Sequence, residues 1–347
     1  MKLQRGLRVL CLAGIMLTLA GCGTKTEYLT QGMEYIKALN YEEAITSFEQ
    51  ALALGEDEKL TYRGMGIAYM GLTDYENAAV NFAAALHKSN GVIEDVDFDI
   101  NLYLAAAYTK EGRYQEAGEI YDAVLALRPK SEEILFLRGT NLLRLGKYAE
   151  AKADFDAAVA MDDKDYDRLI QIYETLDYYG YKDAGQGYLT DALQKYGSEM
   201  GAYNQGRMYY YMRDYEKAYL SLEEAKDPGN SGTYLFLGKA YEATGDYNYA
   251  SSVYNSYLTG VKQDAAIYNQ LGLCELKKGN YAAALTAFQN GMQLEDSVMM
   301  QTLAFNEIVA YEHMGEFSNA FALIENYLKT YPDDSKAKRE YDFLSTR

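Results

Sequence analysis

The side chains that most often perform chemistry in proteins are scarce in this sequence. It contains two histidines, His87 and His313, and three cysteines, at positions 11, 22 and 274. The cysteines form neither a Cys-X-X-Cys pair nor a zinc-binding spacing, and each histidine lacks a second metal ligand at helical distance. Cys274 has no histidine close to it in the sequence, so no nucleophile and base pair is indicated. We therefore expect no enzymatic activity, no cofactor and no bound metal.

One acidic segment has the spacing of a calcium-binding loop. Its five matching positions are Asp163, Asp165, Asp167, Ile170 and Glu174. The loop needs a glycine for its sharp turn, and this sequence has Arg168 there. We interpret the segment as an acidic loop that leads into a helix, whose first turn favours negative charge.

Composition and charge restrict the possible partners. The 347 residues include 33 basic and 51 acidic side chains, for a net charge of −18. Binding to nucleic acid depends on basic surface that displaces counterions, so this balance argues against a nucleic-acid partner. Only three residues are proline, whereas 36 are tyrosine, and the low proline content favours helices.

The N-terminus has the organisation of a secretory signal. Lys2, Arg5 and Arg8 precede an apolar stretch over 9–20, which is too short for a membrane-spanning helix of about 20 residues. The sequence Leu-Ala-Gly-Cys at 19–22 resembles the lipobox of bacterial lipoproteins. The alternatives are a plain signal peptide with a chance cysteine and an uncleaved membrane helix.

The lipobox resemblance implies that the Cys22 thiol is acylated with diacylglycerol and that the chain is cleaved just before it. Residues 1–21 are then a signal peptide, and residues 22–25 are the lipidated cysteine and a short tether. The resemblance also implies an exported protein that is lipid-anchored in a bacterial cell membrane or outer membrane. Its folded part would face the periplasm or the cell exterior.

The remaining sequence repeats one pattern nine times. An aromatic residue is followed, three positions later, by an alanine in strings such as NYEEA at 40–44 and DYENA at 74–78. The repeated alanines are Ala44, Ala78, Ala117, Ala151, Ala184, Ala218, Ala250, Ala284 and Ala320. They are separated by 34, 39, 34, 33, 34, 32, 34 and 36 residues. Such a period is typical of proteins built from stacked repeats.

The residues around each alanine predict two helices per repeat. A glycine or alanine usually stands twelve residues before it, as at Gly238, and an aromatic often stands four residues after it, as at Tyr254. Small residues let two helices approach closely, and an aromatic ring fills the space beside them. Glycines before the motif, such as Gly112 and Gly245, can adopt the left-handed conformation that ends a helix. Each repeat therefore reads as helix, tight turn, helix.

This pattern resembles the tetratricopeptide repeat family. The resemblance implies an all-α fold, a right-handed superhelical solenoid of about nine helix-turn-helix repeats over residues 26–332. Residues 333–347 are expected to form a capping helix that begins at Asp333 or Asp334. The fifth repeat departs from the pattern because Ile172 and Thr175 replace the small residue and the tyrosine. An insertion within 89–100 predicts a longer loop or an extended helix before the third repeat.

A tyrosine-rich patch is the strongest candidate for a binding site. In such solenoids the first helix of each repeat lines the concave face. Counting positions back from the alanines places aromatic and basic residues there in the fifth to seventh repeats. They are Tyr166, Tyr173, Tyr203, Arg207, Tyr210, Tyr211 and Lys239. Tyrosine and arginine are enriched at protein interfaces, although tyrosine is common throughout this chain and simple packing explains such a set as well.

The sequence therefore favours a membrane-anchored scaffold that binds a protein or peptide partner in the cell envelope. The alternative is a receptor for a glycan or small ligand, which would use the same tyrosine-rich groove.

Overall fold

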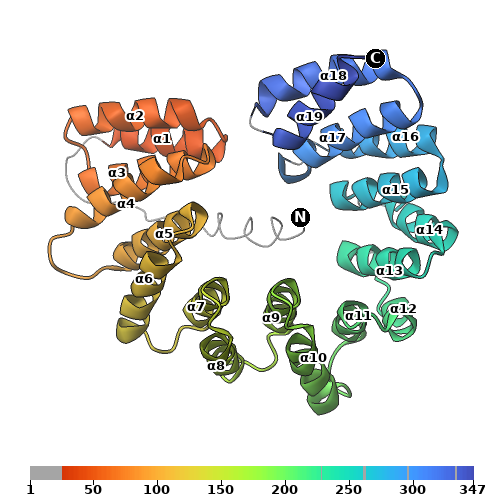
Figure 1. The fold of residues 1–347 in the computed structure, drawn as a ribbon, viewed down its shortest axis with the longest axis horizontal. Helices are drawn as coiled ribbons and strands as arrows, with labels where there is room; N and C mark the ends of the chain where they lie inside the picture. Colours follow the sequence, from red (N-terminus) through yellow and green to blue (C-terminus); the bar gives the residue numbers. More distant parts are fainter. Residues whose placement is uncertain (1–25, 228, 261–262, 295–296, 333) are drawn as a thin grey trace. The chain divides into compact units, whose positions relative to one another are not determined.

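A computed structural model describes residues 26–227, 229–260, 263–294, 297–332 and 334–347. These residues contain 19 helices and no strand, which confirms the all-α fold (Figure 1). The chain divides into two compact units. The first is described from residue 26 to Tyr188 and the second is Leu189–Arg347. None of the described helices has the length and hydropathy to cross a bilayer.

The helices of the first unit are α1 (Glu27–Lys37), α2 (Tyr41–Ala53), α3 (Glu58–Gly71), α4 (Tyr75–His87), α5 (Asp95–Glu111), α6 (Tyr114–Leu127), α7 (Glu132–Arg144), α8 (Tyr148–Val159) and α9 (Tyr166–Tyr178). Helix α10 (Lys182–Tyr196) contains the boundary between the units. The second unit continues with α11 (Ala202–Tyr211), α12 (Tyr215–Glu224), α13 (Ser231–Ala243), α14 (Tyr247–Leu258), α15 (Ala265–Lys278), α16 (Tyr281–Met292), α17 (Ser297–His313), α18 (Phe317–Thr330) and α19 (Ser335–Leu344).

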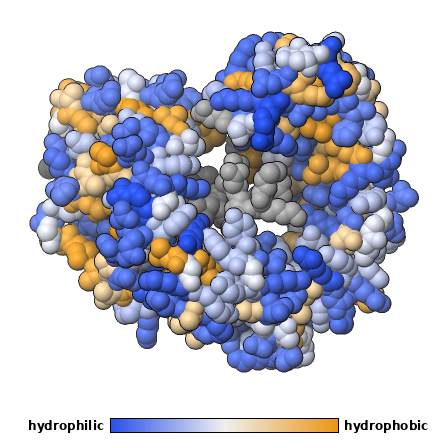
Figure 2. Space-filling model, viewed as in Figure 1, coloured by the Kyte–Doolittle hydropathy of each residue, from blue (hydrophilic) through white to orange (hydrophobic). Residues whose placement is uncertain are grey.

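Successive helices pack as pairs within each unit. In the second unit, α11 packs on α12, α13 on α14, α15 on α16 and α17 on α18. The first helices of neighbouring pairs also touch: α11 contacts α13, and α13 contacts α15. A row of first helices therefore forms one face of the unit. The visible surface of the molecule is mainly hydrophilic, with apolar residues scattered among the polar ones (Figure 2).

The small residue of each repeat is where its two helices meet. A Cβ atom added to Gly32 would lie 2.5 Å from the Phe48 ring, and one added to Gly238 would lie 2.2 Å from the Tyr254 ring. Phe48 and Tyr254 are fully buried. The predicted close approach of the helices, with an aromatic ring over the small residue, is confirmed.

The turn between paired helices adopts the left-handed conformation. Gly112, Gly245 and Gly279 have φ angles of 80°, 85° and 79°, as their positions predict. The first, second and sixth repeats use Leu39, Thr73 and Arg213 at the same place, with φ of 62°, 62° and 65°. The turn geometry is therefore imposed by the repeat even where glycine is missing.

Two irregular parts of the sequence, the insertion before the third repeat and the segment after the ninth, form loop and helix in the structure. The inserted residues lengthen both the loop between His87 and Asp95 and the helix that follows it, since α5 has 17 residues and α3 has 14. Helix α19 starts at Ser335, and Asp334 caps it by accepting hydrogen bonds from the backbone N–H groups of Lys336 and Ala337. Its Leu344 is buried against the end of the last repeat, as a capping helix requires.

The fifth repeat packs differently, because Ile172 fills the space that a small residue leaves in other repeats. Ile172 is fully buried, and the aromatic residue of this repeat, Tyr188, turns its hydroxyl to Asp156 Oδ1 at 2.6 Å. The altered packing that the sequence predicted in this repeat is present.

Candidate binding site on α11 and α13

Six residues of α11 and α13 form one aromatic and cationic cluster. We call it the Phe236 cluster, and it consists of Tyr203, Arg207, Tyr210, Tyr211, Phe236 and Lys239. All six side chains are partly exposed. Helices α11 and α13 are the first helices of consecutive repeats and touch each other, so residues one or two helical turns apart meet here.

Phe236 is the centre of the cluster. The rings of Tyr203, Tyr210 and Tyr211 lie 6.4, 5.5 and 5.9 Å from its ring, measured between centroids. The interplanar angles are 68°, 73° and 58°, so these tyrosines meet Phe236 edge-on or tilted. Such arrangements place the positive ring edge against the negative ring face and stabilise the group beyond simple burial.

Two cations complete the Phe236 cluster. The Arg207 guanidinium carbon lies 5.2 Å from the Tyr203 ring centroid and 5.6 Å from that of Phe236. Lys239 Nζ lies 5.6 Å from the Phe236 centroid. These distances are in the range of cation–π interactions. The aromatic rings therefore hold two positive charges together at the surface of a strongly acidic protein.

The structure separates the predicted patch into three parts. Tyr203, Arg207, Tyr210, Tyr211 and Lys239 come together in the second unit. Tyr166 is the first residue of α9, in the other unit.

Tyr173 must be corrected, because it is a core residue rather than part of a binding face. Only 3% of its surface is exposed. A Cβ atom on Gly185 would lie 3.1 Å from Tyr173 Cα, so the glycine lets α10 approach α9 closely and cover this tyrosine. Tyr173 therefore leaves the candidate site.

Phe236, the residue at the centre, was missed by the sequence analysis. It lies three residues before Lys239, almost one helical turn away, and it is the only member of the cluster that is not a tyrosine or a cation. A search for every aromatic within one turn of Arg207 and Lys239 would have found it.

The acidic segment 163–174 acts as the start of a helix. Asp165 caps α9 by accepting a hydrogen bond of 2.9 Å from the backbone N–H of Arg168. Arg168 forms ion pairs with Glu132 and Glu133 of α7. No group of three or more metal-ligating side chains is found in the described part of the chain.

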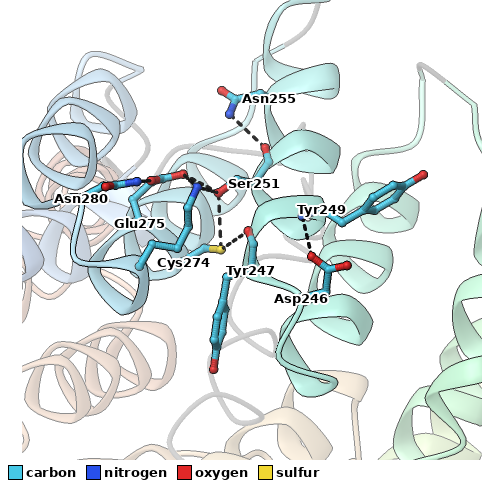
Figure 3. A network of polar contacts seen from close by, with 9 residues as sticks. Asp246, Tyr247, Tyr249, Ser251, Asn255, Cys274, Glu275 and Asn280 are labelled. Carbon is cyan, nitrogen blue, oxygen red and sulfur yellow. Dashed lines mark hydrogen bonds and ion pairs between the residues drawn. The ribbon is translucent and has the colours of Figure 1, made fainter.

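Cys274 belongs to a buried polar network between α14 and α15 (Figure 3). Its Sγ donates a hydrogen bond of 3.3 Å to the Tyr247 carbonyl and lies 3.6 Å from Ser251 Oγ. Ser251 also donates to Glu275, whose carboxylate accepts hydrogen bonds from Lys278 Nζ at 2.8 Å and Asn280 Nδ2 at 2.7 Å. Burial raises the pKa of the Cys274 thiol, which disfavours the reactive thiolate.

The arrangement of helix pairs defines a class of repeat proteins, and comparison with known families gives its name. Two models of the tetratricopeptide repeat match the chain, one over 63–132 and 235–293 and the other over 28–57 and 132–165. The chain is a tetratricopeptide repeat protein.

Similar proteins share these repeats over different lengths. BBSome complex member BBS4 of Bos taurus is 21% identical over 296 residues, which cover 75% of this chain and 56% of that protein. DnaJ homolog subfamily C member 7 of Mus musculus is 29% identical, over 32% of this chain and 24% of that protein. The chain thus spans little more than half the length of the first relative.

Solved structures with similar helix pairs were also found. A tetratricopeptide repeat protein from Parabacteroides merdae ATCC 43184 is 15% identical, with a TM-score of 0.43, and the match covers 80% of this chain and 96% of that chain. YrrB, described as having an unusual peptide-binding site, is 22% identical with a TM-score of 0.39, covering 48% of this chain and 84% of that chain.

Proposed function

We propose that this protein is a lipid-anchored adaptor of the bacterial cell envelope that holds a polypeptide partner on the Phe236 cluster. Tetratricopeptide repeats generally bind protein or peptide partners, so this family favours a scaffold role. The observation that supports this site is the convergence of four aromatic rings and two cations on neighbouring first helices.

The chemistry of the cluster indicates what the partner segment carries. Arg207 and Lys239 can form charge-assisted hydrogen bonds with a carboxylate, and the rings around Phe236 offer contact area to an apolar or aromatic side chain. Because the chain as a whole has a net charge of −18, acidic segments are repelled elsewhere and gain most at this locally positive place. We therefore propose a partner segment with an acidic residue next to an apolar one.

The geometry favours a polypeptide over a glycan. A sugar ring stacks on the flat face of an exposed aromatic ring. In the Phe236 cluster Tyr210 and Tyr211 meet at an interplanar angle of 80° and are inclined to Phe236 by 73° and 58°, so the three rings do not form one flat platform. Rings inclined at such angles, with two cations beside them, suit the side chains of a peptide better than the plane of a sugar ring.

Anchoring through Cys22 is the second part of the proposal. Residues 1–25 lie outside the described residues, and the support is the lipobox-like sequence at 19–22. Helix α1 begins at Glu27, which leaves a tether of only a few residues after Cys22. Stable anchoring takes more than one acyl chain, and a diacylglyceryl group supplies two.

Site-specific photo-crosslinking in cells tests the binding site. p-Benzoylphenylalanine replaces Tyr211 in the cluster or, as a control, Tyr249, which is 47% exposed on α14. We expect one discrete adduct from position 211 that is absent from position 249. The Arg207→Ala variant should reduce this adduct at least fivefold, whereas Leu220→Ala, at a residue 60% exposed on α12, should leave it unchanged. Equal adducts from both positions, or none from position 211, would refute the site.

A further inference from the structure

A groove of about 310 Å³ lies within the first unit, between α6 and the α7–α8 pair. Leu142 of α7 and Leu145, which caps the C-terminus of that helix, provide apolar surface in it, and Gln115 and Lys147 contribute polar groups. Asn141 also lines the groove, although only 2% of its surface is exposed. The groove lies in the first unit, whereas the Phe236 cluster lies in the second.

Asn141 has an unused hydrogen-bonding atom. Its Nδ2 donates a hydrogen bond of 2.8 Å to the Tyr114 carbonyl, which fixes the orientation of the amide. Its Oδ1 is buried and has no hydrogen-bond partner among the described residues. A buried acceptor without a donor is unfavourable and rare in folded proteins, so it requires an explanation.

Ten residues before the motif alanine, the first and fifth repeats have the exposed Glu34 and Glu174, and the six other repeats besides the fourth place apolar or weakly polar residues at this position. These residues are Ala68, Ala107, Met208, Ala240, Cys274 and Ala310, and all are fully buried. In these six repeats the side chain at this position is therefore part of the helix interface, and an amide is not required there. Among the residues at this repeat position, only Asn141 has a buried oxygen without a hydrogen-bond partner in the described structure.

In the seventh and eighth repeats, the site that corresponds to Asn141 and its surroundings is filled by side chains of the protein itself. Cys274 corresponds to Asn141, and it donates to the Tyr247 carbonyl as Asn141 donates to the Tyr114 carbonyl. Ser251 lies beside Cys274 and is bonded to Glu275, and Lys278 reaches Ser251 Oγ at 3.2 Å (Figure 3). Every polar group of that site finds a partner from the chain.

In the groove of the first unit, the corresponding partners are missing. Gly118 stands at the position of Ser251, and Leu142 and Leu145 stand at the positions of Glu275 and Lys278. A Cβ atom on Gly118 would lie 3.3 Å from Asn141 Nδ2, so a larger side chain here would take up space next to the amide. The glycine leaves the groove open where the other repeat pair is filled.

The charged side chains that line the groove carry both signs, and they include the exposed Lys147 and Glu150. Arg138 lies between two carboxylates and binds Asp154 through two hydrogen bonds and Asp122 through one. An ion from solution would have to compete with these pairs. The ligand that fits is therefore neutral, supplies a hydrogen-bond donor to Asn141 Oδ1 and places a small apolar group against the two leucines.

We propose that this groove is a binding site for a neutral secondary amide. Such a group carries an N–H donor for Asn141 and a methyl or methylene group for Leu142 and Leu145. Its carbonyl can accept a hydrogen bond from Lys147 or Gln115. The amide can come from a peptide main chain or from an N-acetylated sugar, which share this chemistry.

Nuclear magnetic resonance of the full-length chain tests the proposal, with the side-chain NH₂ signals of Asn141 as the readout. The probes are N-acetylalanine methylamide for the peptide source, N-acetylglucosamine for the sugar source, and glucose as a compound without an amide. We expect at least one amide probe to shift the Asn141 signals and to saturate in the millimolar range. Which amide probe binds more tightly identifies the source.

Matched substitutions separate binding from folding. Gly118→Ser introduces the side chain found in the filled repeat pair and should weaken the binding of the amide probe at least tenfold. The variant should not lose stability, since serine is a better helix residue than glycine. Asn141→Cys, copied from the eighth repeat, keeps a donor for the Tyr114 carbonyl and should abolish binding, as followed by the backbone signals of Gly118. Ser251→Gly should leave binding unchanged. Unshifted Asn141 signals with both amide probes, glucose binding as tightly as an amide, or undiminished binding in Gly118→Ser would overturn the proposal.

Discussion

The hydroxyl group of Tyr254 donates a hydrogen bond of 2.6 Å to Glu242 Oε1 in the interior of the second unit. Gln270 Nε2 and Lys277 Nζ bind the same carboxylate at 3.0 and 3.1 Å. Glu242 is 8% exposed, so this carboxylate joins α13, α14 and α15 with almost no contact with water. Burial and the Glu242 charge both raise the pKa of Tyr254, which keeps its hydroxyl protonated and able to donate.

Removal of that hydroxyl should destabilise the protein without disturbing its packing. Phe288 occupies the equivalent position in the eighth repeat, so a Phe side chain fits the site. We expect Tyr254→Phe to lower the free energy of unfolding by about 1.5–3 kcal/mol, the usual contribution of a hydrogen bond to a charged group. Urea unfolding followed by circular dichroism measures this loss. Tyr178→Phe, at a tyrosine 56% exposed, is the control and should change stability by less than about 0.5 kcal/mol.

Alanine should be harmful at the small position of a repeat, where glycine is in contact with the aromatic ring. A Cβ atom on Gly272 would lie 2.3 Å from the buried Phe288 ring. We expect Gly272→Ala to cost about 1–3 kcal/mol through overpacking. Gly187→Ala provides the comparison, because its Cβ would meet nothing within 4 Å and alanine favours helix. Thermal unfolding should show a lower midpoint for the first variant and an equal or higher midpoint for the second.

Opposite substitutions at two equivalent left-handed turns should have opposite effects on the stability of the protein. Thr73 has φ of 62° and Gly112 has φ of 80°, and only glycine adopts this region without steric cost. Gly112→Thr should therefore lower stability by about 1–2 kcal/mol. Thr73→Gly should raise it by up to about 1 kcal/mol, reduced by the greater freedom of glycine in the unfolded chain. A loss of stability in both variants by urea unfolding would contradict this explanation.

The capping helix should dock more firmly at acidic pH. Burial, together with the neighbouring carboxylate of Glu340 on α19, raises the pKa of Glu312 on α17 to about 7, while Lys336 opposes the shift. Since the folded state holds this proton more tightly than the unfolded state does, stability falls as the pH rises from the ordinary glutamate value of 4.5 to about 7, and is constant above it.

Hydrogen exchange of the α19 amides, corrected for the intrinsic effect of pH, measures this dependence. Protection should decrease between pH 5 and pH 7.5 in the unaltered chain and should vary much less in Glu312→Gln. Glu325→Gln, at an exposed carboxylate on α18, should behave like the unaltered chain. The same pH dependence in Glu312→Gln and in the unaltered chain would exclude Glu312 as its source.

Membrane attachment depends on a single side chain in our proposal. Cys22→Ser removes the thiol that accepts the diacylglyceryl group, so the variant should leave the membrane fraction after cell fractionation. The far-ultraviolet circular dichroism of the released protein should be unchanged, because residue 22 precedes the first helix, which begins at Glu27. A variant that stays in the membrane fraction would refute the lipobox interpretation.

Much of the fold could be predicted from the sequence because it depends on contacts between residues of the same repeat. The spacing between Gly238 and Tyr254, and the glycine before most of the second helices, reflect contacts inside one repeat, and these contacts recur along the chain. The repeat pattern failed for Tyr173, because its burial depends on Ile172 and Gly185, which change how α9 and α10 pack in one atypical repeat. The position of a residue in the repeat pattern therefore does not predict the exposure of its side chain when the residues that pack against it depart from that pattern.

The candidate sites were predictable only in part, because they arise between repeats. The basic and tyrosine members of the Phe236 cluster were found by counting along α11 and α13, but the central ring was identified only once the helices were placed side by side. Asn141 gives a comparable lesson. Its unusual character depends on Gly118, which lies in the preceding repeat and has no periodic signature of its own.

The start of helix α1 is held by hydrogen bonds to a residue that comes later in the chain, after α2. Glu56, 4% exposed in the loop before α3, accepts hydrogen bonds from the backbone N–H groups of Tyr28 at 3.1 Å and Leu29 at 2.8 Å. These two N–H groups are among those that an α-helix leaves without an internal partner at its start. A load on the first turn of α1 is therefore shared with the loop before α3 through these two bonds. Glu56 therefore couples the start of α1 to the second repeat.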